Sequence, residues 1–251
     1  MTVYRVLDKA TVAPLFAGWE DTMIWSCLQD CMGDAWADHP SRPRSAMILV
    51  ADFCFLAGEP REALLRELPR RDLILAPRHP GWDPVILAMW GDRAAPWVRY
   101  ATHKSPVFDP PALELLAGRL PPGALLRRLD EGLYRQALSA PWSRDLCGNF
   151  ATYRDYRAHG LGVGVVLDGV LVAGASSYTY YRGGIEVEID TRPDHRRRGL
   201  ARACGARLIL DCLARGLVPS WDAHNRESLA LAQQLGYSFA YEYPVFLVTG
   251  G

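Results

Sequence analysis

One segment in the C-terminal half constrains the fold of this 251-residue chain more than any other: a strand that leads through a glycine-containing loop into a helix. Residues 185–191 alternate, with Val187 and Ile189 on one side and charged residues on the other, as expected for a strand that buries one face. Residues 200–215 are predicted to form the helix, and Gly216 supplies its stop. This order indicates an α/β fold.

The loop between this strand and this helix has the features of an anion site. Its residues are Arg196, Arg197, Arg198, Gly199, Leu200 and Ala201. The N-terminus of a helix presents unpaired amide groups and the positive end of the helix dipole. Gly199 allows the backbone to approach a ligand without an intervening Cβ, so the loop is predicted to hold a pyrophosphate.

The elements around this segment continue the α/β order. The dipeptide Asp168-Gly169 lies between the apolar runs 163–167 and 170–176 and predicts a hairpin, because glycine accepts the positive φ of a tight turn. The other predictions in this half are helices over residues 125–138, 150–159 and 226–235 and strands over residues 218–222 and 241–248.

The N-terminal half alternates between the same two kinds of element. Helices are predicted over residues 20–32 and 61–68, after Gly81 and from Asp109, and strands over residues 45–50, 73–76 and 97–102. The Pro121-Pro122-Gly123 sequence must end the last of these helices, because proline lacks an amide hydrogen. We therefore expect two parts, an α/β domain in residues 1–120 and a mixed α/β sheet domain in residues 121–251.

Composition excludes several classes of function. The 28 basic and 28 acidic residues cancel, so the chain lacks the broad positive field of a nucleic-acid or anionic-membrane binder. No apolar stretch reaches the roughly 20 residues that span a bilayer, and the first residues lack the apolar core of a signal peptide. Cys27 and Cys31 have no second Cys/His pair at metal-ligand spacing, so we expect reduced thiols, no metal and a cytoplasmic location.

Two motifs carry a resemblance to a known family. Residues 196–201 resemble the Arg/Gln-x-x-Gly-x-Gly/Ala signature of the GNAT superfamily of N-acetyltransferases, with the preceding strand and following helix where that family has them. A second set of residues looks like a downstream motif of the family: Asn225, Ser228, Leu231, Leu235, Gly236 and Tyr237. The resemblance covers residues 125–251, and residues 219–237 are also similar to a subgroup that includes zwittermicin A resistance acetyltransferases.

The resemblance implies a GNAT-like fold for the C-terminal part, an acetyl-CoA site and a reaction. The backbone of Ile189, Asp190 and Thr191 would pair with pantetheine, and the amides of residues 196–201 would hold the pyrophosphate. Asn225 and Ser228 would line the far side of the cosubstrate. The implied reaction is direct transfer of acetyl from acetyl-CoA to an amine in a ternary complex.

A small-molecule amine, a metabolite or an antibiotic, is the favoured acceptor. A protein amine is the enzymatic alternative, and a non-catalytic CoA-binding or interaction module is a second one. Residues 1–120, which the resemblance does not cover, are expected to shape the acceptor site.

The reaction requires a base, because an amine with a pKa near 10 is protonated at neutral pH and only its neutral form attacks a thioester. Glu188 is the first candidate, since it lies mid-strand on the face opposite Val187 and Ile189. Glu186 and Asp190 share its face, and repulsion among the three carboxylates could raise one pKa. Asp222 and His224, at the end of the adjacent strand, are the rival candidates.

One position departs from the family pattern. Where many relatives have a tyrosine that protonates the departing thiolate, this chain has Ala232. Either CoA leaves as the thiolate, which a thiol pKa near 8.5 allows, or Tyr237 or Tyr241 substitutes for the missing tyrosine.

Overall fold

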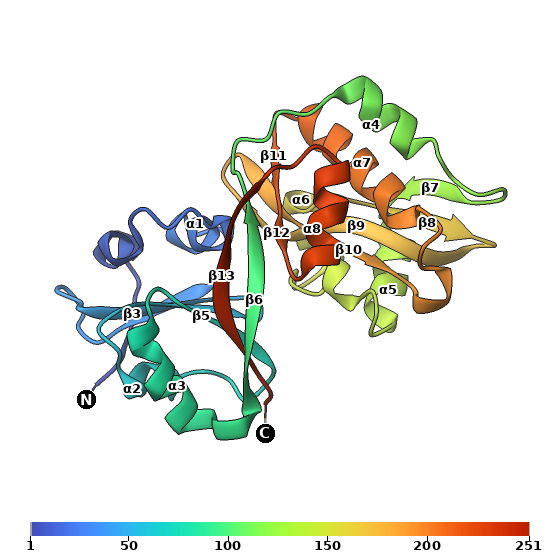
Figure 1. Cartoon of the computed structure of the whole chain (residues 1–251). Helices are drawn as coiled ribbons and strands as arrows, with labels where there is room; N and C mark the ends of the chain where they lie inside the picture. Colours follow the sequence, from blue (N-terminus) through green and yellow to red (C-terminus); the bar gives the residue numbers. More distant parts are fainter. Residues whose placement is uncertain (1, 251) are drawn as a thin grey trace. The chain divides into compact units, whose positions relative to one another are not determined.

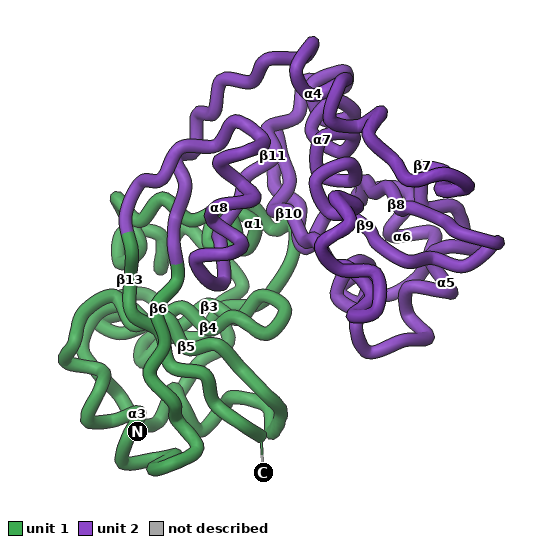
Figure 2. The backbone as a smooth tube through the Cα atoms, turned by 45° about the vertical axis from the view of Figure 1, so that its right-hand side comes forward, with its two compact units in different colours: residues 1–99, 242–251 green, residues 100–241 purple. Residues whose placement is uncertain are grey.

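The chain divides into two compact units in the computed structural model, which describes residues 2–250. Unit 1 combines residues 2–99 with residues 242–250, and unit 2 comprises Tyr100–Tyr241 (Figure 2). The division therefore lies at Arg99/Tyr100 and again near the C-terminus, whereas the sequence led us to expect a single boundary at Pro121. The difference arises because residues 100–120 pack with the C-terminal elements.

Unit 2 is built around a five-stranded mixed sheet (Figure 1). Its strand order is β11-β10-β9-β8-β7, with bounds β7 Leu125–Arg128, β8 Gly162–Leu167, β9 Val170–Tyr181, β10 Gly184–Thr191 and β11 Val218–Ser220. Only the β10–β11 pairing is parallel. The remaining elements are α4 Pro110–Ala117, α5 Glu131–Ser139, η5 Arg144–Leu146, α6 Tyr153–His159, η6 Pro193–His195, α7 Leu200–Leu213, β12 Asp222–Ala223 and α8 Arg226–Gln234.

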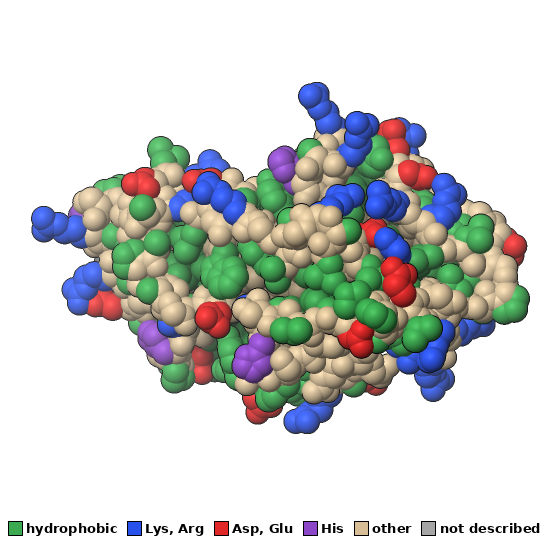
Figure 3. Space-filling model, turned by 90° about the horizontal axis from the view of Figure 1, so that it is seen from above, with side chains coloured by type: hydrophobic (Ala, Val, Ile, Leu, Met, Phe, Trp, Pro, Cys, Tyr) green, Lys and Arg blue, Asp and Glu red, His purple; other side chains and the backbone are tan. Residues whose placement is uncertain are grey.

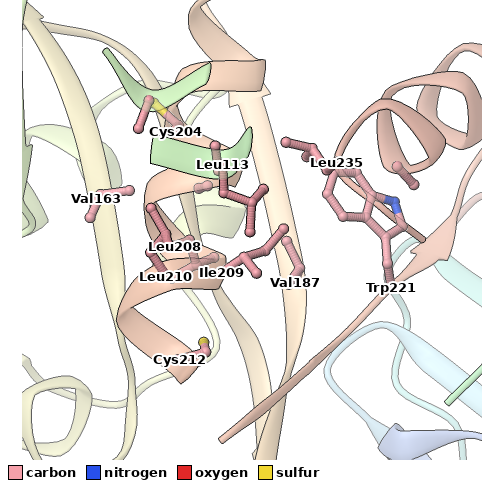
Figure 4. Close-up of a cluster of buried hydrophobic side chains, with 14 of the residues drawn as sticks. Leu113, Val163, Val187, Cys204, Leu208, Ile209, Leu210, Cys212, Trp221 and Leu235 are labelled. Carbon is pink, nitrogen blue, oxygen red and sulfur yellow. The ribbon is translucent and has the colours of Figure 1, made fainter. Parts of the chain in front are cut away.

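Each face of this sheet has its own hydrophobic core. Helix α7 packs on one face, together with α4 and α8, in a cluster that includes Val187, Ile209 and Leu235 (Figure 4). Side chains from α5, η5 and α6 form a second cluster against Val166 and Leu171. Ile185 and Val187 of β10 belong to the α7 cluster and Ile189 packs against it, so the expected alternation of this strand is confirmed.

Short polar signals set the ends of the elements in unit 2. The carboxylate of Asp130 accepts the amide of Leu133 at 2.9 Å and starts α5 at Glu131. Asp168 and Gly169 have φ angles of 49° and 80° and form the predicted hairpin turn between β8 and β9.

The helix predicted over residues 125–138 is wrong in its first part. Leu125–Arg128 is strand β7, which pairs antiparallel with β8, and the helix begins only after Asp130. Pairing with the free edge of β8 outweighs the local helical pattern, which is a common tertiary override of propensity. The strand predicted over residues 218–222 is interrupted at Trp221 and forms β11 and β12, which belong to different sheets.

Unit 1 contains most of the second sheet. The strand order of that sheet is β1-β2-β3-β4-β5-β13-β6-β12, with bounds β1 Tyr4–Arg5, β2 Asp34–Ala37, β3 Ser45–Val50, β4 Phe53–Gly58, β5 Leu73–Pro77, β6 Ala94–Thr102 and β13 Phe239–Val248. The helices are η1 Lys9–Thr11, η2 Ala13–Phe16, α1 Thr22–Leu28, α2 Glu62–Leu65, η3 Pro80–Trp82, α3 Asp83–Trp90 and η4 Gly91–Arg93. Strands β4 and β5 are parallel, so both sheets are mixed.

Several elements of unit 1 differ from the sequence-based expectation. The helix expected over residues 20–32 is limited to Thr22–Leu28, because the Asp21 side chain caps its start and Asp30 adopts a φ of 57° beyond its end. The apolar stretch that contains the predicted strand 45–50 forms a second strand, β4, after a turn at Ala51. Among the described residues, no helix is both long and apolar enough to cross a membrane.

Candidate active site

The central feature of the candidate site is the divergence of two parallel strands in unit 2. Strands β10 and β11 pair from Gly184↔Val218 to Glu186↔Ser220. Beyond this point β10 continues to Thr191 alongside β9, whereas the other strand passes Trp221 and continues as β12, which pairs with β6 in the second sheet. The two strands thus open into a V with one arm of β10 and one arm of β12.

The second arm of the V is fixed by hydrogen bonds to its backbone carbonyl groups. Thr102 donates its hydroxyl to the carbonyl of Trp221 at 2.6 Å, where the arm begins, and Tyr237 donates to that of Pro219 at 3.1 Å in the preceding strand β11. The indole of Trp221 donates to the hydroxyl of Ser228 at 3.2 Å. The contacts of Trp221 fix the position at which the second arm begins.

The first arm leads into the loop and the N-terminus of α7. Gly199 is the N-cap residue with a φ of 78°, and no side chain caps the helix there. Arg197 also has a positive φ, 60°. A 14-residue helix with uncapped first amides, preceded by left-handed residues, is an anion-binding arrangement of backbone N–H groups. A Cβ built on Gly199 meets only Arg202 Nη2, at 3.6 Å, so the space directly beside Gly199 is open.

A sequence model described as GNAT acetyltransferase matches residues 13–246 of the chain. The chain belongs to this family. A GCN5-related N-acetyltransferase-like protein from Streptococcus suis 89/1591 has a crystal structure that superposes with a TM-score of 0.92 at 42% identity, covering 96% of this chain and 98% of that chain. The "Uncharacterized N-acetyltransferase YdfB" of Bacillus subtilis is 26% identical over 98% of this chain and 99% of its own length.

The two-unit organisation also has structural relatives. A tandem GNAT protein from the clavulanic acid biosynthesis pathway superposes with a TM-score of 0.53 at 16% identity and covers all of this chain. That level of similarity concerns the fold alone. The chain therefore has a tandem GNAT-like two-domain architecture, and as a GNAT enzyme it is an acetyl-CoA-dependent N-acyltransferase.

The carboxylates predicted on β10 lie on the side of the sheet opposite α7. Glu186 is only 3% exposed, while Glu188 and Asp190 are half-buried, so this face is covered and not a solvated surface. Burial raises the pKa of Asp190 to about 6, the nearby charge of Asp145 acts in the same direction, and Arg196 opposes it.

The raised pKa of Asp190 leads to a prediction about stability. In the folded protein the carboxyl holds its proton up to about pH 6, whereas in the unfolded chain it loses it near 3.9, so the free energy of unfolding falls as the pH rises between these values. Asp190→Asn should raise the free energy of unfolding by about 1–2 kcal/mol at pH 7.5 and change it little at pH 4. Urea unfolding at both pH values measures this, and an equal change at both would show that burial of the charged carboxylate is not the cause.

The rival base candidates lie on the other arm. Asp222 is 9% exposed in β12, and His224 is exposed directly after this strand. Glu188 and Asp222 each follow the last paired residue of their strand, Glu186 and Ser220, by two positions. The register therefore places one carboxylate at the equivalent position on each diverging strand.

The second family motif has structural contacts of its own. Asn225 is the N-cap of α8, and its side-chain oxygen accepts the amide of Ser228 at 2.8 Å. Together with the Trp221–Ser228 bond, this cap fixes α8 to the end of β12. That Asn225 and Ser228 line the acetyl-CoA site remains a prediction. Both residues lie at the first turn of α8, which these hydrogen bonds hold in place.

The tyrosines considered for protonation of the thiolate differ in environment. Tyr237 is 4% exposed, its proton is engaged with the carbonyl of Pro219, and burial raises its pKa well above the usual value. Tyr241 is 43% exposed on β13. Ala232, at the position where many GNAT relatives have tyrosine, is fully buried in the α7 cluster.

Two features of the site were not found from the sequence. The hydroxyl oxygen of Thr191 is buried and has no hydrogen-bond partner among the described residues, although only a backbone role was expected for this residue. Asp194 binds Arg192 and His195 within the loop, and the sequence contains no periodic signal for such a contact.

The residues present fit an acetyl-CoA molecule at this place. The uncapped amides of α7 and the positive φ of Gly199 suit a pyrophosphate. The Thr191 hydroxyl, which has no hydrogen-bond partner among the described residues, lies where β10 ends and the loop to α7 begins. On the face seen in Figure 3, the basic and acidic side chains of the described residues are interspersed.

Proposed function

We propose that this GNAT enzyme transfers the acetyl group of acetyl-CoA to the amine of a small molecule, and that both bind at the V formed by β10 and β12. The observation that carries the proposal is the divergence of these strands beside the uncapped N-terminus of α7. Residues 196–201 would hold the pyrophosphate through their amides, and the backbone of Ile189–Thr191 would pair with pantetheine. Asn225 and Ser228 would lie on the opposite side.

Bound acetyl-CoA would supply a thioester carbonyl as the group that the amine attacks. The carboxylate of Glu188 would accept a proton from the ammonium form of the acceptor, directly or through water, because only the neutral amine is nucleophilic. Asp222 and His224 are the alternative bases, with Asp190 next on the β10 arm. Since the Tyr237 proton is engaged with Pro219, we propose that CoA leaves as the thiolate and that the extra proton on the newly acylated nitrogen passes to water.

Direct attack agrees with the state of the cysteines in unit 2. Cys147, Cys204 and Cys212 are fully buried, and burial raises the pKa of each to about 12. They are therefore thiols at neutral pH and do not offer a thiolate for a covalent acetyl-enzyme. This supports a ternary complex over an acetylated intermediate.

One observation supports a small-molecule acceptor, and a second supports an amine of any kind. The likeness of residues 219–237 to zwittermicin A resistance acetyltransferases suggests an antibiotic or metabolite amine. In addition, carboxylates lie on both arms of the V, Glu188 and Asp190 on one and Asp222 on the other, and they would attract a protonated amine.

Unit 1 does not repeat the features of this cosubstrate site. Its connection between parallel strands, from β4 to β5, contains helix α2 of only four residues, whereas α7 has 14. The segment before α2 contains the single arginine Arg61, and the Glu59 carboxylate pairs with Arg61 and with Arg44, so these cations already have an anionic partner within unit 1. We therefore propose that unit 1 contributes to the choice of acceptor and not to acetyl-CoA binding.

The function is tested by measuring free-thiol release from acetyl-CoA with a panel of amines. We expect release well above the hydrolysis background with one class of small amines and its loss in Glu188→Gln. Release with protein amines alone would favour the alternative acceptor, and no release with any amine despite tight acetyl-CoA binding would favour a non-catalytic module.

A chimera that carries the segments of the Streptococcus suis relative equivalent to residues 2–99 and 242–250 should change the preferred amine. An unchanged preference would contradict the role of unit 1.

A further inference from the structure

Asp194 lies at the centre of a hydrogen-bonded network inside the loop of residues 192–199, which we call the phosphate loop after the site proposed above. Its Oδ1 accepts from Arg192 Nε at 2.7 Å and its Oδ2 from Arg192 Nη2 at 2.9 Å, which is a bidentate pair. The Nδ1 atom of His195 lies 2.9 Å from Asp194 Oδ1. The backbone carbonyl of Asp194 accepts from Arg198 Nη2 at 3.3 Å. One residue thus binds three basic side chains of the same loop.

The loop needs such a contact because of its charge. Between Thr191 and Gly199 the sequence has four arginines and a histidine, and Asp194 is the only carboxylate. Repulsion among these cations opposes the compact loop when no phosphate is bound. The strong pairing is also visible in the pKa of Asp194, which the bonds from Arg192 and His195 hold well below its usual range.

The three consecutive arginines Arg196 to Arg198 differ in the contacts of their side chains. Arg196 donates to the carbonyl of Thr191 at 3.3 Å, and Arg198 is tied to Asp194. Arg197, in contrast, is exposed, has a φ of 60° and makes no side-chain hydrogen bond or ion pair with any residue in 2–250. The network thus ties Arg192, His195 and Arg198 to Asp194 while it leaves the guanidinium of Arg197 available.

We propose that Asp194 is a positioning residue for acetyl-CoA, which holds the phosphate loop in its binding conformation before the ligand arrives. The inference rests on the proposed cosubstrate site at residues 196–201. Its energetic basis is preorganisation: without the Asp194 carboxylate, Arg192 and His195 lose their shared partner, and ordering them falls to the binding step.

The direction in which Asp194→Asn changes the affinity for acetyl-CoA distinguishes this positioning role from a simple charge effect. Coulomb's law alone predicts that Asp194→Asn strengthens the binding of the negatively charged CoA, because it removes a negative charge from the loop. Preorganisation predicts the opposite, a weakening of about tenfold, the size expected when two side chains must be ordered on binding.

Calorimetric titration with acetyl-CoA tests the inference in the full chain. Asp194→Asn should raise Kd about tenfold, and in the acetyl-transfer assay it should raise the KM for acetyl-CoA while kcat at saturation stays near the parent value. The double variant Arg192→Gln/Asp194→Asn keeps the parent net charge, and its Kd should also be raised about tenfold, because both single changes remove the same contact. Asp168→Asn, in the β8–β9 turn, is the matched control for loss of one negative charge and should bind acetyl-CoA like the parent.

Parent-like or tighter binding by Asp194→Asn, with a parent-like double variant, would overturn the positioning role and leave only the charge effect. An equal loss in Asp168→Asn would overturn it as well. Failure of the underlying site looks different, because Gly199→Val would then leave the affinity unchanged. A thermal melt with the parent midpoint shows that each variant compared is folded.

Discussion

Replacement of Glu188 by glutamine is expected to lower kcat by about 10²- to 10⁴-fold at neutral pH, the usual loss when a general base is removed. Glu188 lies on β10 two residues beyond the point where β10 and β11 separate, on the face opposite the α7 core. Glutamine keeps the size of the side chain but cannot accept the proton of an ammonium group. The Kd for acetyl-CoA should therefore stay near the parent value.

The pH dependence of the Glu188→Gln variant separates a base from a packing residue. As the pH approaches the amine pKa near 10, a growing share of the acceptor is already neutral, so the defect should shrink. Loss of stability without rescue at high pH would instead indicate packing. Glu131→Gln on the exposed start of α5 is the control and should keep the parent kcat. A folded Glu188→Gln enzyme with parent-like kcat at pH 7 would transfer the role to Asp222, His224 or Asp190.

Substitution of valine for Gly199 should weaken acetyl-CoA binding at least about 100-fold. The φ of 78° at this N-cap lies in the left-handed region, which a β-branched residue adopts only with strain. Refolding of the N-cap to a negative φ would redirect the first amides of α7, and a retained φ would place the valine side chain in front of them. Either outcome removes the hydrogen bonds that the pyrophosphate needs, and calorimetry measures the loss.

The same helix offers a matched control for the strain introduced by valine. Gly216 follows the other end of α7, has a φ of 66° and has no atom within 4 Å of an added Cβ. Gly216→Val should therefore lower the free energy of unfolding to a similar extent as Gly199→Val while acetyl-CoA binds with the parent affinity. If Gly199→Val is folded and binds acetyl-CoA like the parent, the phosphate site must lie elsewhere in the chain.

The sequence predicted the parts of the fold around the candidate site that depend on local patterns. The alternation of β10, the turn at Asp168-Gly169 and the glycine before α7 are set by neighbouring residues and were found correctly. The structure also confirms the buried strand 45–50. Local signals were sufficient for these features because each of them lies within a few residues.

Two of the features that the sequence missed depend on partners far along the chain, and a third depends on loop geometry. Leu125–Arg128 became a strand because β8 offers an edge to it, and β12 left the sheet of β11 because β6 pairs with it. The bidentate contact of Arg192 with Asp194 is local, but no hydrophobic periodicity predicts it, because it depends on the loop geometry around Pro193. Tertiary pairing and loop geometry of this kind are outside the reach of propensity and hydrophobic period.

The position of β13 has a consequence for the order of events during synthesis. This strand is the last of the chain, but it lies between β5 and β6 in the sheet, with Phe246 paired to Leu75. A nascent chain that has emerged through residue 99 carries nearly all of unit 1 and still has a missing central strand, with two open edges where β13 belongs. Translation proceeds at about 5–20 residues per second, so these edges stay exposed for several seconds or longer while the rest of the chain is made. Unit 1 therefore cannot complete its sheet until residues 100–241 of unit 2 have been synthesised, although unit 1 begins the sequence.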